Sequence, residues 1–177
     1  MDKAKEGGAD AIKFQSYKAN KIAVRNSPSY WDLGQEPTKS QFELFNKYDK
    51  FWKKEYVELK EHCDKVKIEF LSTPFDLESA GFLNDLMGVY KISSSDLNNQ
   101  PFIEKICEYK KPIILSTGAS YYKEIKKTVN LIKSFGNKLA LLHCVLNYPT
   151  LNKNANLEKI KHLNNLFPRI PIGYSDH

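Results

Sequence analysis

Short apolar segments alternate along this chain with longer amphipathic ones. The short segments predict buried strands, because a brief apolar and β-branched run bounded by glycine, proline or polar residues fits a strand better than a helix. They lie at residues 11–15, 68–73, 89–92, 112–117, 139–144 and 171–176. The pattern therefore predicts six strands separated by other structure.

The segments between these strands carry apolar residues at helical spacing and predict helices. They span residues 39–48, 51–65, 76–87, 101–109, 119–135 and 156–167, and residues 1–8 resemble the tail of another helix. Residues 16–35 mix polar and aromatic positions and predict a long loop, which in a compact domain is usually functional.

Short apolar strands that alternate with amphipathic helices are typical of a parallel sheet covered on both faces. Periodicity leaves two folds open, an open doubly wound sheet and a (β/α)8 barrel. Polar residues follow nearly every predicted strand, which favours the barrel, because barrel active sites gather at the carboxyl ends of several strands. Neither GxGxxG nor GxxxxGK[ST] occurs, so the commonest dinucleotide and P-loop interpretations are excluded.

Composition narrows the class of protein further. A length of 177 residues predicts a single domain, 1–177. The net charge is +6, but Arg25 and Arg169 are the only arginines, so nucleic acid is not expected as a partner. No apolar run approaches the roughly 20 residues of a membrane helix, and residues 1–5 lack a signal peptide's apolar core, so we expect a cytoplasmic protein without a membrane partner. The cysteines lack metal or disulfide spacing and are interpreted as reduced apolar fillers: Cys63, Cys107 and Cys144.

Two lysines lie inside predicted strands. Lys91 is followed by three serines and Asp96, and Lys13 lies within the 11–15 segment. Burying an unpaired ammonium costs several kcal/mol, so both lysines are expected to meet an anion. With hydroxyls at other strand ends, they predict a phosphate or carboxylate site, although for any single Ser or Thr a capping or loop role is the more ordinary interpretation.

The histidines differ in their sequence context. His177 follows Ser175 and Asp176 at a strand end, where it could bind a divalent metal or act as an acid or base. His143 is interpreted as a hydrogen-bonded core histidine, whereas His62 and His162 are expected on solvent-facing helix surfaces.

Several of these blocks, taken together, resemble the sialic acid synthase family. The resemblance is collinear over essentially the whole chain and rests on Ala9-Asp10-Ala11-Ile12-Lys13-Phe14-Gln15, Ser72-Thr73-Pro74-Phe75-Asp76, Tyr90-Lys91-Ile92-Ser93-Ser94, Lys111-Pro112-Ile113-Ile114-Leu115-Ser116-Thr117-Gly118, Leu141-Leu142-His143-Cys144, Asn147-Tyr148-Pro149-Thr150 and Gly173-Tyr174-Ser175-Asp176-His177.

The resemblance implies a (β/α)8 barrel that condenses phosphoenolpyruvate with N-acetylmannosamine or a related amino sugar and uses a divalent metal, Mn²⁺ or Mg²⁺. It also implies a homodimer for the full-length protein. The implied substrate-binding residues are Lys13, Thr73, Lys91, Ser94, Ser116 and Ser175. Gln15 and Tyr148 are implied to contact the sugar, Asp96 to stand near the reacting centre, and His177 to bind the metal.

The sequence also departs from the family pattern. The family's opening Ala-Glu-Ile-Gly strand with its catalytic Glu, a second metal-binding His and the last strand are not found, so we expect an incomplete barrel that lacks its first and last strands. Leu146 replaces a polar residue that some relatives place beside the phosphate. Two alternatives stay open, another phosphate-binding barrel aldolase or keto-acid synthase, and an inactive anion-binding fragment.

Overall fold

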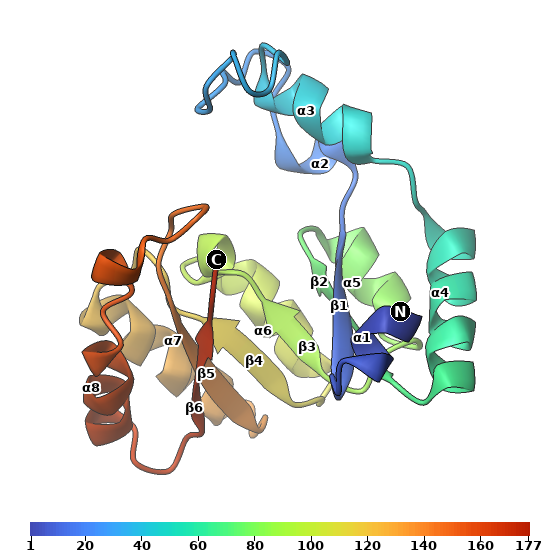
Figure 1. The fold of residues 1–177 in the computed structure, drawn as a ribbon. Helices are drawn as coiled ribbons and strands as arrows, with labels where there is room; N and C mark the ends of the chain where they lie inside the picture. The colour runs from blue at the N-terminus through green and yellow to red at the C-terminus, as the bar shows by residue number, and fades with distance from the viewer. The chain divides into compact units, whose positions relative to one another are not determined.

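All 177 residues of the chain are described in a computed structural model (Figure 1). Residue contacts divide the chain into two units, Met1–Leu86 and Met87–His177, and each unit is described by itself. Both units are built from parallel strands joined through helices, so the predicted α/β class is confirmed. The single-domain organisation and the (β/α)8 barrel stay predictions.

The first unit contains a two-stranded parallel sheet, β1–β2, in which Ala11 pairs with Glu69 and Gln15 with Thr73. Helices α4 and α5 pack against β2. On one face of the sheet Phe14 stacks on Phe70 with ring centroids 5.6 Å apart. The elements of this unit are α1 (Asp2–Glu6), β1 (Ala11–Ser16), α2 (Ala19–Ile22), α3 (Gln41–Tyr48), α4 (Lys53–Val66), β2 (Glu69–Pro74) and α5 (Leu77–Leu83).

The second unit contains a four-stranded parallel sheet in the order β3-β4-β5-β6, with α6, α7 and α8 in the connections between neighbouring strands (Figure 1). This sequential order is that of consecutive βαβ units. The elements are β3 (Tyr90–Ile92), the 3₁₀ helix η1 (Ser94–Asp96), α6 (Gln100–Glu108), β4 (Ile113–Ser116), α7 (Tyr122–Ser134), β5 (Leu139–Cys144), the 3₁₀ helix η2 (Asn152–Asn154), α8 (Glu158–Leu166) and β6 (Ile172–Ser175).

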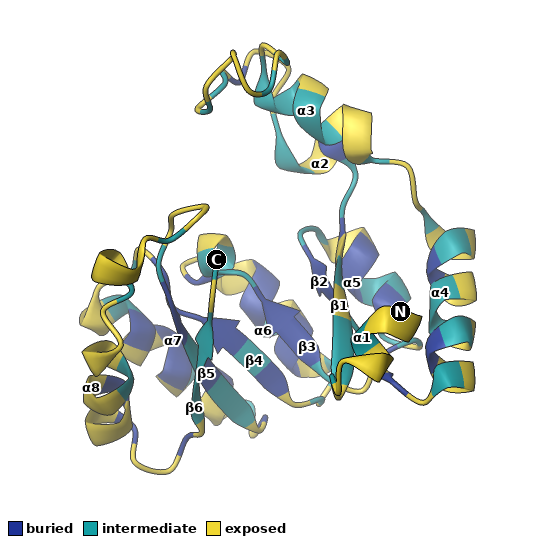
Figure 2. Ribbon diagram, viewed as in Figure 1, coloured by how far each residue is buried: buried dark blue, intermediate teal, exposed yellow.

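The two faces of this second sheet carry different side chains. Both β3 and β4 are deeply buried, as Figure 2 shows. One face is packed by apolar residues that include Tyr90, Leu115 and Leu141, each fully buried. Tyr90 stacks on Tyr109 at the end of α6, with ring centroids 5.5 Å apart, so this face is the helix-covered one. The opposite face carries Lys91 and, through the strand register, the residues paired beside it.

Side-chain caps fix where several helices begin. Asp76 accepts a hydrogen bond from the backbone N–H of Ser79 at 2.9 Å and so caps α5, as its position in the sequence predicts. Ser40 caps α3 in the same way through the N–H of Glu43. Lys67, with φ of 57°, ends α4 in the left-handed conformation.

Some predicted boundaries are wrong. The loop predicted at 16–35 contains the short helix α2. The helix predicted over 76–87 ends at Leu83, and the one predicted over 119–135 begins at Tyr122 because Ala119 has a positive φ of 49° and lies in a turn. No helix of the chain is both long and apolar enough to cross a bilayer.

Candidate functional site

A cluster of polar groups lies at the carboxyl ends of the strands of the second unit, and it includes Lys91 of β3. The residue is 7% exposed. Its ammonium donates hydrogen bonds to Ser116 Oγ at 2.6 Å and to the carbonyl of Ile92 at 2.9 Å. Lys91 pairs with Ile114 in the sheet, and Ser116 lies two residues further along the same face of β4. The prediction of a buried lysine in this strand is confirmed.

The contact between Lys91 and Ser116 fixes what each group offers a ligand. A hydroxyl has one proton and two lone pairs, whereas an ammonium only donates. Since Ser116 Oγ accepts from Lys91, its own proton remains to be donated elsewhere. The pair therefore combines a buried positive charge with a hydroxyl donor, which is the chemistry that binds phosphate and carboxylate oxygens.

Ser94 adds a second hydroxyl at the end of β3. Its Oγ accepts a hydrogen bond from the backbone N–H of Gly118 at 2.9 Å and lies 3.2 Å from Cys144 Sγ. Cys144 is in turn the register partner of Ser175 on β6. The carboxyl ends of β3, β4, β5 and β6 thus bring the predicted residues Lys91, Ser94, Ser116 and Ser175 to one end of the sheet.

His177 is held next to Ser175 by several contacts. Its Nδ1 bonds the carbonyl of Val145 at 2.8 Å, and because a carbonyl only accepts, this nitrogen carries the proton. Its Nε2 then faces Ser175 Oγ at 3.3 Å and the Tyr148 hydroxyl at 3.4 Å. The Tyr148 and His177 rings stack with centroids 4.2 Å apart, although Tyr148 is 74% exposed.

This geometry suits His177 as a metal ligand. A backbone carbonyl on one ring nitrogen fixes the tautomer and orients the other nitrogen, as is usual for metal-bound histidines. The chain holds no cluster of three or more His, Cys, Asp or Glu side chains arranged for a metal ion, so His177 would supply one ligand. The residues present therefore fit part of a metal coordination shell.

Asp96 lies in η1, two residues after Ser94. Burial raises the pKa of its carboxyl group, while hydrogen bonds from Asn99 and Ser95 act in the opposite direction. A carboxyl group with a raised pKa is suited to proton transfer.

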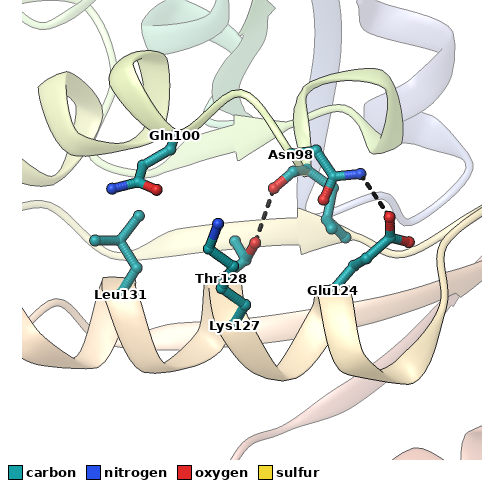
Figure 3. Close-up of a pocket in the computed structure, with 7 residues that line it drawn as sticks. Asn98, Gln100, Glu124, Lys127, Thr128 and Leu131 are labelled. Carbon is teal, nitrogen blue, oxygen red and sulfur yellow. Dashed lines mark hydrogen bonds between the residues drawn. The ribbon is translucent and has the colours of Figure 1, made fainter.

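The residues that follow η1 are hydrogen-bonded to helix α7 (Figure 3). Asn98 donates its amide to Glu124 at 3.1 Å, and Thr128 donates its hydroxyl to the carbonyl of Leu97 at 2.8 Å. Leu97 is 1% exposed, so the second bond is well shielded from water. These contacts hold the turn that carries Ser94 and Asp96. The same residues help to line a groove between α6 and α7 (Figure 3).

In the first unit, the predicted residues Lys13, Gln15 and Thr73 share one face of the β1–β2 sheet, because Gln15 pairs with Thr73 and Lys13 lies two residues before Gln15. Thr73 is 3% exposed, whereas Lys13 and Gln15 are exposed. The predicted burial of Lys13 is therefore wrong. Desolvation by nearby atoms still lowers the pKa of its ammonium, although the side chain is exposed at the surface of the unit.

The physical reason is the alternation of side chains along β1. Phe14 and Ser16 face Phe70 and Ser72, with the two serine hydroxyls 2.7 Å apart, and this face is the one that packs. Lys13 points to the other face. Because it lies in a different unit from Lys91, a joint anion site of the two lysines stays a prediction.

The other histidines and the cysteines agree with the interpretations from sequence. His143 is 2% exposed and its Nε2 bonds the carbonyl of Ala155 at 2.8 Å, which confirms a hydrogen-bonded core histidine. His62 contacts Asp2 at 3.0 Å on the surface, and the His162 ring lies against Tyr122. The three cysteines are buried free thiols.

Two groups around Ser94 were missed by sequence reasoning. On sequence alone, Gly118 has no assigned site role and Cys144 is interpreted as an apolar filler, yet both contact the Ser94 hydroxyl. The available signal was their position at strand ends, beside Ser116-Thr117 and after His143.

Comparison with known proteins agrees with the family resemblance found in the sequence. Residues 1–177 match the NeuB family. The N,N'-diacetyllegionaminic acid synthase of Campylobacter jejuni is 38% identical over 98% of this chain and 53% of its own length. The N-acetylneuraminate-9-phosphate synthase of Drosophila melanogaster is 30% identical over 98% of this chain and 47% of its own length.

A solved structure is similar in fold as well as in sequence. The N-acetylneuraminic acid synthetase of Leptospira borgpetersenii, in complex with citrate, matches with a TM-score of 0.84 and 33% identity over 99% of this chain and 57% of that one. The chain spans about half the length of the curated relatives that it matches. Because the family match covers every residue, the chain belongs to the NeuB family of sialic acid synthase-like proteins.

Proposed function

We propose that the protein condenses phosphoenolpyruvate with an N-acetylated amino sugar, N-acetylmannosamine or a related sugar, to give a nine-carbon 2-keto sugar acid and phosphate. The observation that carries the proposal is the buried Lys91, hydrogen-bonded to Ser116 at the strand ends of a NeuB-family chain. The names of the relatives, which are synthases of such sugar acids, support this reaction class.

Phosphoenolpyruvate is the anion whose charge and oxygen count suit the strand-end cluster. In the proposal, Lys91 supplies the charge, and Ser94, Ser116 and Ser175 donate hydroxyl protons to its oxygens. Lys13 and Thr73, which share a face of the β1–β2 sheet, are also proposed to bind phosphoenolpyruvate, as the family resemblance implies. Such a site holds the donor in one orientation, which lowers the entropic part of the barrier to joining two substrates.

Tyr148 is proposed to contact the acceptor sugar, and the family resemblance implies the same role for Gln15. Tyr148 is exposed and stacked on His177, so its ring and hydroxyl are accessible to a ligand. C3 of phosphoenolpyruvate attacks the sugar aldehyde, water adds at C2, and the resulting tetrahedral carbon expels phosphate. Asp96, whose pKa is raised by burial, is proposed to exchange a proton near this centre.

A divalent ion, Mn²⁺ or Mg²⁺, would supply Lewis-acid polarisation of the sugar aldehyde when bound. His177 would hold it through Nε2, and the carbonyl of Val145 would keep the ring in place. His177→Gln should weaken Mn²⁺ binding, measured by calorimetry without substrates, and unchanged binding would remove His177 from the metal site.

The complete protein is proposed to be a cytoplasmic (β/α)8 barrel that forms a homodimer. The consecutive parallel βαβ units support the barrel. Light scattering after gel filtration would test the dimer: a mass of one chain would exclude it.

Phosphate release tests the proposed reaction. Full-length protein should release phosphate from phosphoenolpyruvate only when an N-acetylated amino sugar and a divalent metal are both present, and release without sugar would contradict the proposal. Borohydride trapping with pyruvate separates it from a Schiff-base aldolase. No adduct is expected, because in the proposed reaction Lys91 holds the anion through hydrogen bonds and forms no covalent bond with the substrate.

A further inference from the structure

Ser94 is contacted by two groups that come from other strand ends. The backbone N–H of Gly118, two residues beyond β4, donates to Ser94 Oγ at 2.9 Å, and Cys144 Sγ, at the end of β5, lies 3.2 Å from the same oxygen. Cys144 is 6% exposed, so its thiol is largely shielded from water. Three chain segments therefore meet at one hydroxyl.

The approach of Gly118 requires the absence of a side chain. A Cβ at this position would lie 2.9 Å from Cys144 Sγ and 3.1 Å from Ser94 Oγ. Both distances are shorter than ordinary contacts of a carbon atom. Glycine is thus needed at position 118 for the backbone N–H to reach Ser94 while the thiol stays in place.

The two contacts constrain the direction of the Ser94 proton. A hydroxyl oxygen accepts through two lone pairs and donates one proton, and a thiol is a weak donor. In the Ser94–Cys144 contact either atom can be the donor. In the arrangement inferred below, the N–H of Gly118 and the S–H of Cys144 both donate to Ser94 Oγ, so its lone pairs are used and its proton points to another acceptor.

We propose that Gly118 and Cys144 are positioning residues that commit the Ser94 hydroxyl to donating its proton to the bound anion. The inference rests on the proposed function, in which that anion is phosphoenolpyruvate. Neither residue touches the substrate in this arrangement, and each acts through Ser94.

A mutant cycle tests whether Cys144 acts through Ser94. Cys144→Ala, Ser94→Ala and the double variant are compared in full-length protein by calorimetric Kd for phosphoenolpyruvate and by KM and kcat. Cys144→Ala should weaken binding about threefold, the size of one modest hydrogen bond, and change kcat much less. In the Ser94→Ala background the same substitution should add nothing.

Two matched variants separate positioning from packing. Cys144→Ser keeps a donor beside Ser94 and should restore affinity close to that of the wild type. Cys107→Ala removes another fully buried free thiol, on α6, and should lower thermal stability while leaving the Kd for phosphoenolpyruvate unchanged.

Gly118→Ala gives an independent test. The added methyl group should displace Ser94 and weaken binding by about tenfold or more, because the N–H contact is lost along with the fit. Adding Cys144→Ala should recover part of this loss, since the closest contact of the new Cβ is the sulfur atom. Circular dichroism would verify that each variant is folded.

The outcomes distinguish the inference from the proposed function. If the wild type is active, two results overturn the positioning inference and leave the proposed function intact. One is a Kd for phosphoenolpyruvate that Cys144→Ala does not change, and the other is an equal loss of affinity from Cys144→Ala in the wild-type and Ser94→Ala backgrounds. Wild-type protein that binds phosphoenolpyruvate but releases no phosphate with any N-acetylated amino sugar refutes the reaction, while the Kd series still decides the positioning role. Protein that does not bind phosphoenolpyruvate overturns both.

Discussion

Replacing Lys91 with methionine separates binding from stability at the centre of the site. Methionine has nearly the same length and flexibility as lysine but no charge and no N–H donors. In the structure the change removes hydrogen bonds to Ser116 Oγ and to the carbonyl of Ile92, 2.6 and 2.9 Å long, from a side chain in a residue only 7% exposed.

The expected effects on the fold nearly cancel. Orphaned buried oxygens cost about 1–3 kcal/mol each, whereas removing a buried ammonium returns several kcal/mol of desolvation free energy. The free energy of unfolding should therefore change by no more than about 2 kcal/mol. Binding of an anion has no such compensation, because hydrogen bonds from charged donors contribute about 1.5–3 kcal/mol each. A loss of about 3 kcal/mol corresponds to roughly a 100-fold rise in Kd.

Calorimetry with phosphoenolpyruvate and urea unfolding measured by circular dichroism provide the two readouts. Lys111→Met is a matched control. Lys111 also donates to a backbone carbonyl, that of Met87 at 2.8 Å, but it precedes β4 and so lies at the amino end of the sheet. The control should change stability without changing the Kd.

The reasoning would be refuted by a Lys91→Met protein that binds phosphoenolpyruvate as well as the wild type. It would also fail if Lys111→Met lost affinity to the same degree, since the effect would then be general and not local to the strand ends.

Three further predictions follow from buried polar groups. Burial raises the pKa of Asp96, so its contribution to stability is full below the ordinary aspartate pKa and is lost as the pH rises through the raised value. The free energy of unfolding of Asp96→Asn in urea should therefore increase relative to that of the wild type between about pH 3 and about pH 7. A difference between the two proteins that does not change with pH would contradict this. Thr128→Val removes the bond to the Leu97 carbonyl and should cost about 1–3 kcal/mol of unfolding free energy, with no measurable cost as the contrary result. Burial raises the pKa of the Cys107 thiol to about 11, so iodoacetamide at about pH 8 should label it only after unfolding, as mass spectrometry would detect.

The alternation of apolar and amphipathic segments was sufficient to place the strands and most helices. Strands are short apolar runs and helices have their own period, and both properties are local in sequence. Boundaries failed where a backbone conformation decided them, as at Ala119, whose positive φ delays α7. The cap at Asp76 is different, because a side-chain cap needs only neighbouring residues and can therefore be recognised from local sequence.

The two strand lysines mark the limit of sequence reasoning. Lys13 and Lys91 occupy the same local pattern, and each lies opposite an apolar residue of the neighbouring strand, Leu71 or Ile114. Yet Lys13 is exposed, whereas Lys91 is buried and donates a hydrogen bond to Ser116. Which strand lies alongside, and in what register, is not written in the local sequence.

The sequence by itself determined the parallel α/β class, the strand-end positions of the candidate site residues and the family resemblance, because each depends on local pattern. Only the tertiary structure decided that Gly118 and Cys144 converge on Ser94 and that Lys13 faces water. The physical reason is that hydrogen bonds and burial depend on atoms brought close from distant parts of the chain, and the pairing of the strands together with the turns that follow them sets those distances.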